Sequence, residues 1–245
     1  MKKMGFWEQG FSEQIRCNLA YAGAVMICTW LYTGYLHWKF SLTLQKNKNL
    51  SKVDVVSKVL LNQIIQTCVF ISLGSYLDEQ QSIKVLSEEE TNRIKNGMVV
   101  VGRVILAMVL IDTWQYWMHR LAHRWKWAFQ KIHIVHHYFV IPEPVGGFYN
   151  HIVESLIMDG GSFAFAQILS GMSNETAAML GLFANLKTIH DHLGIDSPRD
   201  DWMTLWSYVS DNNADYHRKH HQQQKGNFQQ PFFTFWDRFC GTNLL

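Results

Sequence analysis

The chain has 245 residues, enough for one sizeable domain or two small ones, and 22 Lys and Arg against 20 Asp and Glu leave a formal net charge of +2. A chain with this balance has no large excess of positive charge with which to bind nucleic acid, and we exclude nucleic acid as a partner. The four cysteines show neither zinc-ribbon nor redox spacing, and they suggest no disulfide framework.

Two stretches in the first third of the chain are long enough to cross a bilayer. Residues 17–38 and 59–77 contain no Asp, Glu, Lys or Arg, and a helix needs about 20 apolar residues to cross the hydrocarbon core. A third candidate, 96–118, is interrupted by Arg103, which is costly at mid-bilayer unless it is paired or close to an end. The alternative for the first two stretches is a pair of buried core helices.

A fourth apolar region runs from about residue 155 to 186 and is broken by the turn formers of "GMSNET". We interpret it as a helical hairpin that enters the bilayer and returns. The expected fold is therefore all-α and multi-pass, with about three spans plus a helical hairpin.

The loops between the spans set the expected orientation. Five lysines and one aspartate lie between the first two spans, whereas three basic and five acidic residues lie between the second and the third. Short cytoplasmic loops favour Lys and Arg. We therefore expect the first loop in the cytosol and the second in the lumen, so that the third span ends in the cytosol.

Eight of the twelve histidines fall into three short clusters: "HRLAH" at 119–123, "HIVHH" at 133–137 and "HRKHH" at 217–221. Residues three and four apart share a helix face, so each cluster directs its outer imidazoles one way. Neutral imidazole is the commonest nitrogen ligand of transition metals. Because eight imidazoles exceed the needs of one ion, the pattern predicts a site for two. The residue types alone are compatible with zinc, copper, iron or nickel as the metal. The HExxH motif of many zinc hydrolases is absent.

The segments "YWMHRLAH", "HIVHH", "TIHDHLG" and "YHRKHH…NFQQPFFTFWDRFCGT" resemble the fatty acid hydroxylase superfamily of membrane di-iron enzymes. The C-terminal "NNADYHRKHHQQQKGNFQQPFFTFWDRFCGTN", together with "NQIIQT" and the Lys-rich loop before it, resembles in particular the sphingoid-base 4-hydroxylases. The resemblance covers the chain from about residue 25 to the end. It suggests N-terminal spans and loops over 1–97 and a hydroxylase-like catalytic region over 98–245.

The resemblance implies an endoplasmic-reticulum enzyme with two irons at a cytosol-facing site. It also implies molecular oxygen as the oxidant and cytochrome b5, or a similar separate protein, as the electron donor. The implied iron ligands are the histidines that match the family's boxes and the single histidine of its "DDHCG"-like element: His119, His123, His133, His136, His137, His192, His217, His220 and His221.

The sequence departs from the family pattern at two positions, and the roles of the histidines there are undecided. The chain has His190 where the family element has Asp, and we expect this histidine not to be a direct ligand. Ile152 replaces the usual Pro after "YNH", which leaves His151 as either a ligand or a supporting group. Ligating histidines usually bond a carboxylate or carbonyl through their second nitrogen. The candidate carboxylates near the boxes are Asp112, Glu154, Asp191 and Asp215.

The expected function is that of a sphingolipid 4-monooxygenase, which hydroxylates sphinganine or dihydroceramide to phytosphingosine-type products. The alternatives are another lipid oxidase of the superfamily (a sterol methyl oxidase, sterol desaturase or fatty acid 2-hydroxylase), a zinc hydrolase, and a non-catalytic membrane scaffold that retains the boxes. No chemistry is expected of the C-terminal aromatic segment, where Asp237 and Arg238 are candidates for a structural ion pair.

Overall fold

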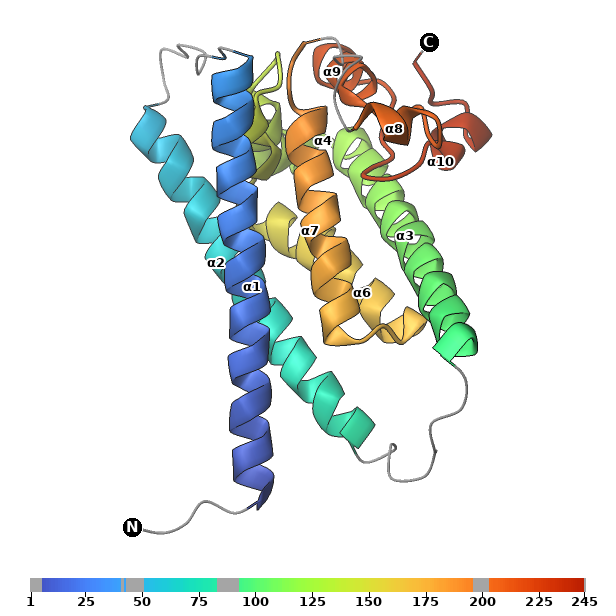
Figure 1. Ribbon diagram of the computed structural model, residues 1–245. Coiled ribbons are helices and arrows are strands. Elements are labelled where there is room, and N and C mark those ends of the chain that lie inside the picture. The colour runs from blue at the N-terminus through green and yellow to red at the C-terminus, as the bar shows by residue number, and fades with distance from the viewer. Residues whose placement is uncertain (1–5, 41, 43–50, 83–92, 196–202, 245) are drawn as a thin grey trace.

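The computed structural model describes residues 6–40, 42, 51–82, 93–195 and 203–244, and within these ranges every regular element is a helix. Three long helices dominate (Figure 1): α1 (Phe6–Lys39), α2 (Lys52–Ser82) and α3 (Arg93–Arg124). α1 packs against α2, and α7 (Asn174–Asp191) packs against α1. α3 packs mainly against α6 (Gly161–Ser170).

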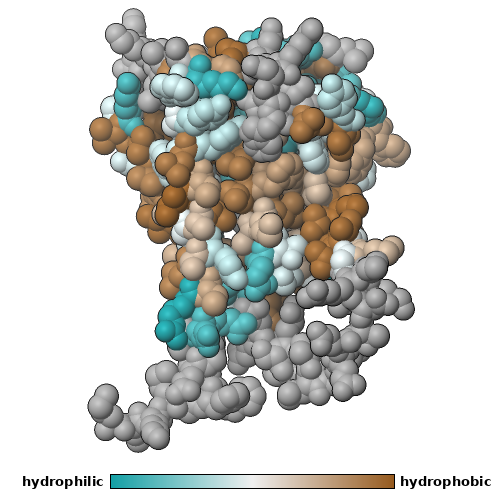
Figure 2. Space-filling view, in the orientation of Figure 1, coloured by the Kyte–Doolittle hydropathy of each residue, from teal (hydrophilic) through white to brown (hydrophobic). Residues whose placement is uncertain are grey.

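Within the described part of the chain, four helical stretches are long and apolar enough to cross a membrane: Glu13–Lys39, Lys52–Leu77, Gly97–Arg124 and Ile152–Ser170. The chain is therefore a multi-pass membrane protein, as the sequence predicts. Figure 2 shows the corresponding surface, a broad apolar band with polar residues on either side of it. The first two helices extend well beyond the charge-free runs, because a helix can continue through polar residues once it has left the hydrocarbon region.

The predicted hairpin is present. Its first arm comprises α5 (Ile152–Glu154), the π-helical η4 (Ser155–Gly160) and α6, and its second arm is α7. Gly171 ends α6 in the left-handed conformation with φ of 66°, a geometry that favours glycine. The Ser173 side chain then caps α7 by accepting a bond from the Thr176 amide. The Arg103 guanidinium lies beside Gly171 at this turn, which places the charge near the end of the third span.

The polar residues of the second span bond to other parts of the bundle. Asn62 donates to the Asn150 carbonyl at 2.9 Å, and Gln63 accepts from Trp30 at 2.7 Å. Gln66 donates to the carboxylate of Asp159 at 3.0 Å. These bonds explain how an apolar span tolerates three amides, since each amide has a partner inside the protein.

The short elements gather at one end of the bundle, where α1, α3 and α7 end and α2 begins (Figure 1). They are α4 (Lys126–Lys131), the 3₁₀ helices η2 (His133–Tyr138) and η3 (Pro144–Phe148), α8 (Thr204–Ser207), α9 (Ala214–Gln223) and α10 (Phe235–Phe239). A buried apolar cluster that includes Leu36, Phe148 and Ile189 packs η3 against α1 and α7. This end of the protein carries all three histidine clusters.

Candidate metal centre

Nine buried or half-buried histidines converge at this end of the bundle and form two groups. One contains His119, His123, His133, His137 and His220, and the other contains His136, His192, His217 and His221. Within each group the nearest ring nitrogens all lie within 4.8 Å of one another. Clusters separated by about a hundred residues thus meet at one place, and these nine are the histidines that the resemblance singles out as ligands.

The two groups divide the clusters according to residue spacing. In α9, His217 and His221 are four residues apart and belong to one group, while His220 between them points to the other. The same division holds in η2, where His133 and His137 share a group and His136 belongs to the second. η2 is a 3₁₀ helix, in which residues three apart eclipse one another, and the His133 and His136 rings are stacked. The outer histidines of each cluster, four residues apart, therefore share a group as their spacing predicts, whereas the group of the middle histidine is not predicted.

Hydrogen bonds through Nδ1 orient most of the rings. His119 donates to the Phe228 carbonyl at 2.8 Å, and His220 donates to the Gly226 carbonyl at 2.8 Å. In the second group, His221 bonds the Phe139 carbonyl at 2.9 Å and His192 bonds the Thr188 carbonyl at 2.7 Å. Because a carbonyl can only accept, the proton of these neutral rings lies on Nδ1 and the lone pair lies on Nε2.

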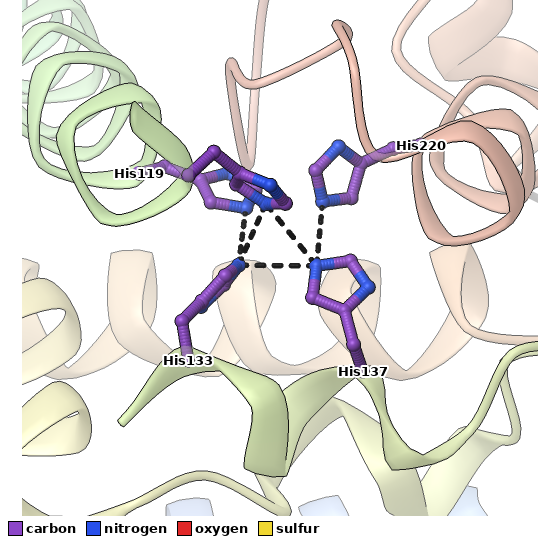
Figure 3. A group of neighbouring side chains, drawn as sticks. His119, His133, His137 and His220 are labelled. Carbon is purple, nitrogen blue, oxygen red and sulfur yellow. Dashed lines mark hydrogen bonds between the residues drawn. The ribbon is translucent and has the colours of Figure 1, made fainter. Parts of the chain in front are cut away.

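The arrangement of the Nε2 atoms fits a bound cation. His119 Nε2 lies 3.1 Å from His133 Nε2, and both rings already donate through Nδ1, the second of them to Glu154. His136 and His221 make the matching approach in the other group at 3.1 Å. Two unprotonated nitrogens cannot hydrogen-bond each other, so only a positive ion between them turns this contact from repulsive to favourable. Figure 3 shows the rings of His119, His133, His137 and His220 in the larger group turned toward one another.

Burial keeps these rings neutral and therefore competent as ligands. It lowers the pKa of His136 and of His192 to about 3. It also holds the pKa values of His217, His220 and His221 well below the usual range, with a further lowering from neighbouring imidazoles. Both groups are thus able to bind metal ions at neutral pH.

One of the four candidate carboxylates contacts a histidine of the two groups. Glu154 accepts from His133 Nδ1 at 2.5 Å, and both side chains are buried. The other three bond elsewhere: Asp191 pairs with Lys187 at 2.5 Å, Asp215 pairs with Arg218, and Asp112 accepts from the backbone amides of Phe232 and Phe233. The two histidines whose roles the sequence leaves undecided, His151 and His190, lie outside both groups. His151 caps α5 through its ring, and His190 is buried in α7.

Sequence reasoning missed residues that support the groups from a distance. Asn150 accepts from His136 Nδ1 at 2.8 Å. Asp237 accepts from the amides of Phe228 and Gln229, at 3.0 and 2.6 Å, and so fixes the segment whose carbonyl receives His119. The expectation of an Asp237–Arg238 pair is wrong, because Arg238 pairs with Asp211 instead. The Asn150 and Asp237 bonds join residues only 8 to 14 positions apart, but no motif in the sequence indicates them.

A small cavity of about 60 Å³ is lined by His119, His133, His136 and His192. A larger one of about 170 Å³ lies among α1, α2, α6 and α7, with apolar walls that include Val25, Phe70 and Phe163. Four residues line both cavities, which therefore adjoin: Gln115, Gly147, Asp159 and Thr188. The arrangement joins an apolar space in the membrane-spanning bundle to the histidine groups.

Comparison with known proteins gives a consistent picture. Residues 104–242, more than half of the chain, match the fatty acid hydroxylase family. Sphinganine C4-monooxygenase 1 of Arabidopsis thaliana is 37% identical over 90% of this chain and 85% of its own length. Very-long-chain aldehyde decarbonylase GL1-9 of Oryza sativa subsp. japonica is 35% identical over 82% of this chain and 74% of its own. Sphingolipid C4-hydroxylase SUR2 of Saccharomyces cerevisiae is 32% identical over 81% and 60%. No solved structure matches the chain.

Proposed function

This chain belongs to the fatty acid hydroxylase family, and on that premise we propose that it is a sphingolipid 4-monooxygenase. Family membership and the two histidine groups make it a membrane lipid oxidase that uses molecular oxygen. The proposed substrates are sphinganine or dihydroceramide, hydroxylated at carbon 4 to phytosphingosine-type products. The observation that carries this choice is the similarity to sphinganine C4-monooxygenases along nearly the whole chain.

We propose iron as the metal, with the larger histidine group holding one ion and the smaller group holding the other. Imidazole-rich sites also suit other transition metals, but the family's chemistry requires a metal that activates oxygen. Two bound irons would supply that activation for insertion into a carbon–hydrogen bond. Glu154 would then fix the tautomer and direction of His133, and Asn150 would do the same for His136.

The adjoining cavities supply the other requirements of such a reaction. The apolar walls of the larger cavity suit an alkyl chain, and they exclude water from the path to the histidines. The smaller cavity is lined by polar groups, among them Asn150, Glu154 and Gln230, next to four histidines. A long-chain lipid would therefore lie with its tail in the bundle and its polar end at the metal centre.

One oxygen atom enters the product and the other leaves as water, so the reaction needs two electrons and two protons from outside. We propose cytochrome b5 or a similar protein as the electron donor and the endoplasmic reticulum as the location. The excess of lysine in the loop between α1 and α2 supports a cytosolic position for the histidine end of the bundle. Residues 43–50 of that loop lie outside the described residues.

A second candidate reaction is that of the aldehyde decarbonylase relative, whose similarity is almost as extensive. Cells that lack C4-hydroxylated sphingolipids can be supplied with this chain and their lipids analysed. Restored phytosphingosine-type lipids would support the proposal. Altered sterols, 2-hydroxy acids or aldehyde-derived lipids, with unchanged sphingolipids, would contradict it. The metal content of the purified protein, measured in the same experiment, distinguishes iron from zinc.

A further inference from the structure

Asp159 lies where the two cavities meet, and it lines both of them. It is carried by the π-helix η4, four residues after Ser155. The small cavity that it lines also exposes His119, His133, His136 and His192. A group bound to Asp159 would therefore lie between the apolar cavity and the metal centre, where the reacting part of a lipid has to be.

The two oxygens of Asp159 differ in their surroundings. Oδ2 accepts from Gln66 Nε2 at 3.0 Å, from Ser155 Oγ at 3.4 Å and from Asn150 Nδ2 at 3.5 Å. Among the described residues, none donates a hydrogen bond to Oδ1, and no lysine or arginine pairs with the carboxylate. A carboxylate in a low-dielectric interior is costly unless an opposite charge compensates it. Oδ1 is thus available to a cationic ligand.

We propose that Asp159 binds the ammonium group of a free long-chain base and so aligns the substrate, an inference that rests on the proposed function. In sphinganine the nitrogen is on carbon 2, two carbons from carbon 4. An ammonium held at Asp159 keeps carbon 4 at the junction of the cavities, beside the histidines. The remaining alkyl chain extends from that point into the apolar cavity.

The same contact distinguishes the free base from its N-acylated form. An ammonium is a cation with three donors, and it forms a charge-assisted bond with a carboxylate. The nitrogen of dihydroceramide is a neutral amide with one donor and carries a second acyl chain. The preferred substrate is therefore sphinganine rather than dihydroceramide.

A purely structural role for Asp159 makes a different prediction. Asn150 donates to Asp159 and accepts from His136. A structural Asp159 would therefore act only by orienting this metal ligand. In that case its loss would reduce metal content and would affect both substrates equally. A role in binding the ammonium affects the free base alone and leaves the metal in place.

The test is Asp159→Asn in the full-length, metal-loaded protein. The amide oxygen of Asn can keep the three donors now on Oδ2, which turns its NH2 group toward the cavity, where it opposes an ammonium. Binding of radiolabelled sphinganine without oxygen should weaken at least about tenfold, as the loss of a charge-assisted bond predicts. Binding and hydroxylation of dihydroceramide and the metal content should stay within about twofold. The exposed Asp211, which pairs with Arg238, gives the matched control Asp211→Asn with no change.

Each result has one consequence. Equal losses on both lipids, or loss of metal, would make Asp159 a positioning residue and overturn the inference. Unchanged sphinganine binding in Asp159→Asn, or a wild-type protein that hydroxylates only dihydroceramide, would overturn it as well while leaving the proposed function intact. A wild-type protein that hydroxylates neither lipid would refute the proposed function, and the anaerobic binding measurement would still decide the role of Asp159.

Discussion

Glu154 accepts a 2.5 Å hydrogen bond from His133 Nδ1 in a site where both side chains are buried. The Nε2 atom of the same ring lies among those of His119, His123 and His137. The carboxylate therefore sets both the tautomer and the direction of one ring in the larger histidine group.

Replacing Glu154 with Ala should lower metal affinity by about 10- to 100-fold, as the loss of such supporting bonds typically does. The protein should still insert into the membrane, because insertion depends on the apolar spans. Metal content after dialysis against a graded chelator series measures the effect. Glu175→Gln, at an exposed position in α7, is the control and should retain full metal content. Equal retention by both variants would contradict the role given to Glu154.

His133→Ala or His220→Ala should abolish 4-hydroxylation and leave the amount of protein in the membrane unchanged, because each removes an imidazole from the larger group. Product formation per amount of membrane protein is the measurement. His151→Ala and His190→Asp alter histidines outside both groups, and both variants should retain activity. A dead His190→Asp variant would give that residue an essential role, and near-normal product from either alanine variant would exclude the corresponding histidine as an essential ligand.

The metal-free protein should lose stability as the pH falls below 6.5. Burial lowers the pKa of His136 and His192 to about 3 in the folded state, whereas an unfolded histidine titrates near 6.5. Between these values the unfolded state binds more protons, so stability rises with pH across the window. Each such histidine costs about 1.4 kcal/mol per pH unit below 6.5. The thermal unfolding midpoint in detergent should fall steeply from pH 6.5 to 5.5 and stay level above 7.5; a flat profile would be the contrary result.

Gly226→Ala should disturb the larger histidine group, although Gly226 is not a member of it. A Cβ at this position would overlap the Thr242 carbonyl oxygen, and relief of the overlap would move the Gly226 carbonyl that receives His220 Nδ1. Overpacking of this kind costs about 1–3 kcal/mol, so both the unfolding midpoint and the metal content should drop. Gly102→Ala has no neighbour within 4 Å of its new Cβ and should be neutral or slightly stabilising.

The proposed orientation can be tested with two glycosylation sequons in the natural sequence. Asn49 lies outside the described residues, in the loop expected in the cytosol, and should stay unmodified in a glycosylating cell. Asn174 is 3% exposed and accepts from Gln167 at 2.6 Å, so it should remain unmodified on either side of the membrane. A glycosidase-sensitive mass shift assigned to Asn49 would reverse the topology and place the histidine groups in the lumen.

The extent of sequence-based prediction differs between the fold and the site. The charge-free runs and the "GMSNET" break predict the spans and the hairpin, because both reflect local composition. The spacing of the boxes identifies histidines that converge and pairs the outer ones, but it does not say which group the middle histidine of a cluster joins, His136 in one case and His220 in the other. The roles of Asn150, Gly226 and Asp237 were not predictable, since each acts on residues brought near by folding. The π-helix that carries Asp159 likewise has no signal in the apolar periodicity.

The division of histidines between the groups has a consequence for the order of events during biosynthesis. Both groups include members of α9, His220 in one and His217 and His221 in the other. A nascent chain in which the four candidate spans have already been made and inserted therefore still lacks part of each group. Neither group has its full set of imidazoles until the ribosome has passed residue 221, so both sites can mature only after α9 has been synthesised.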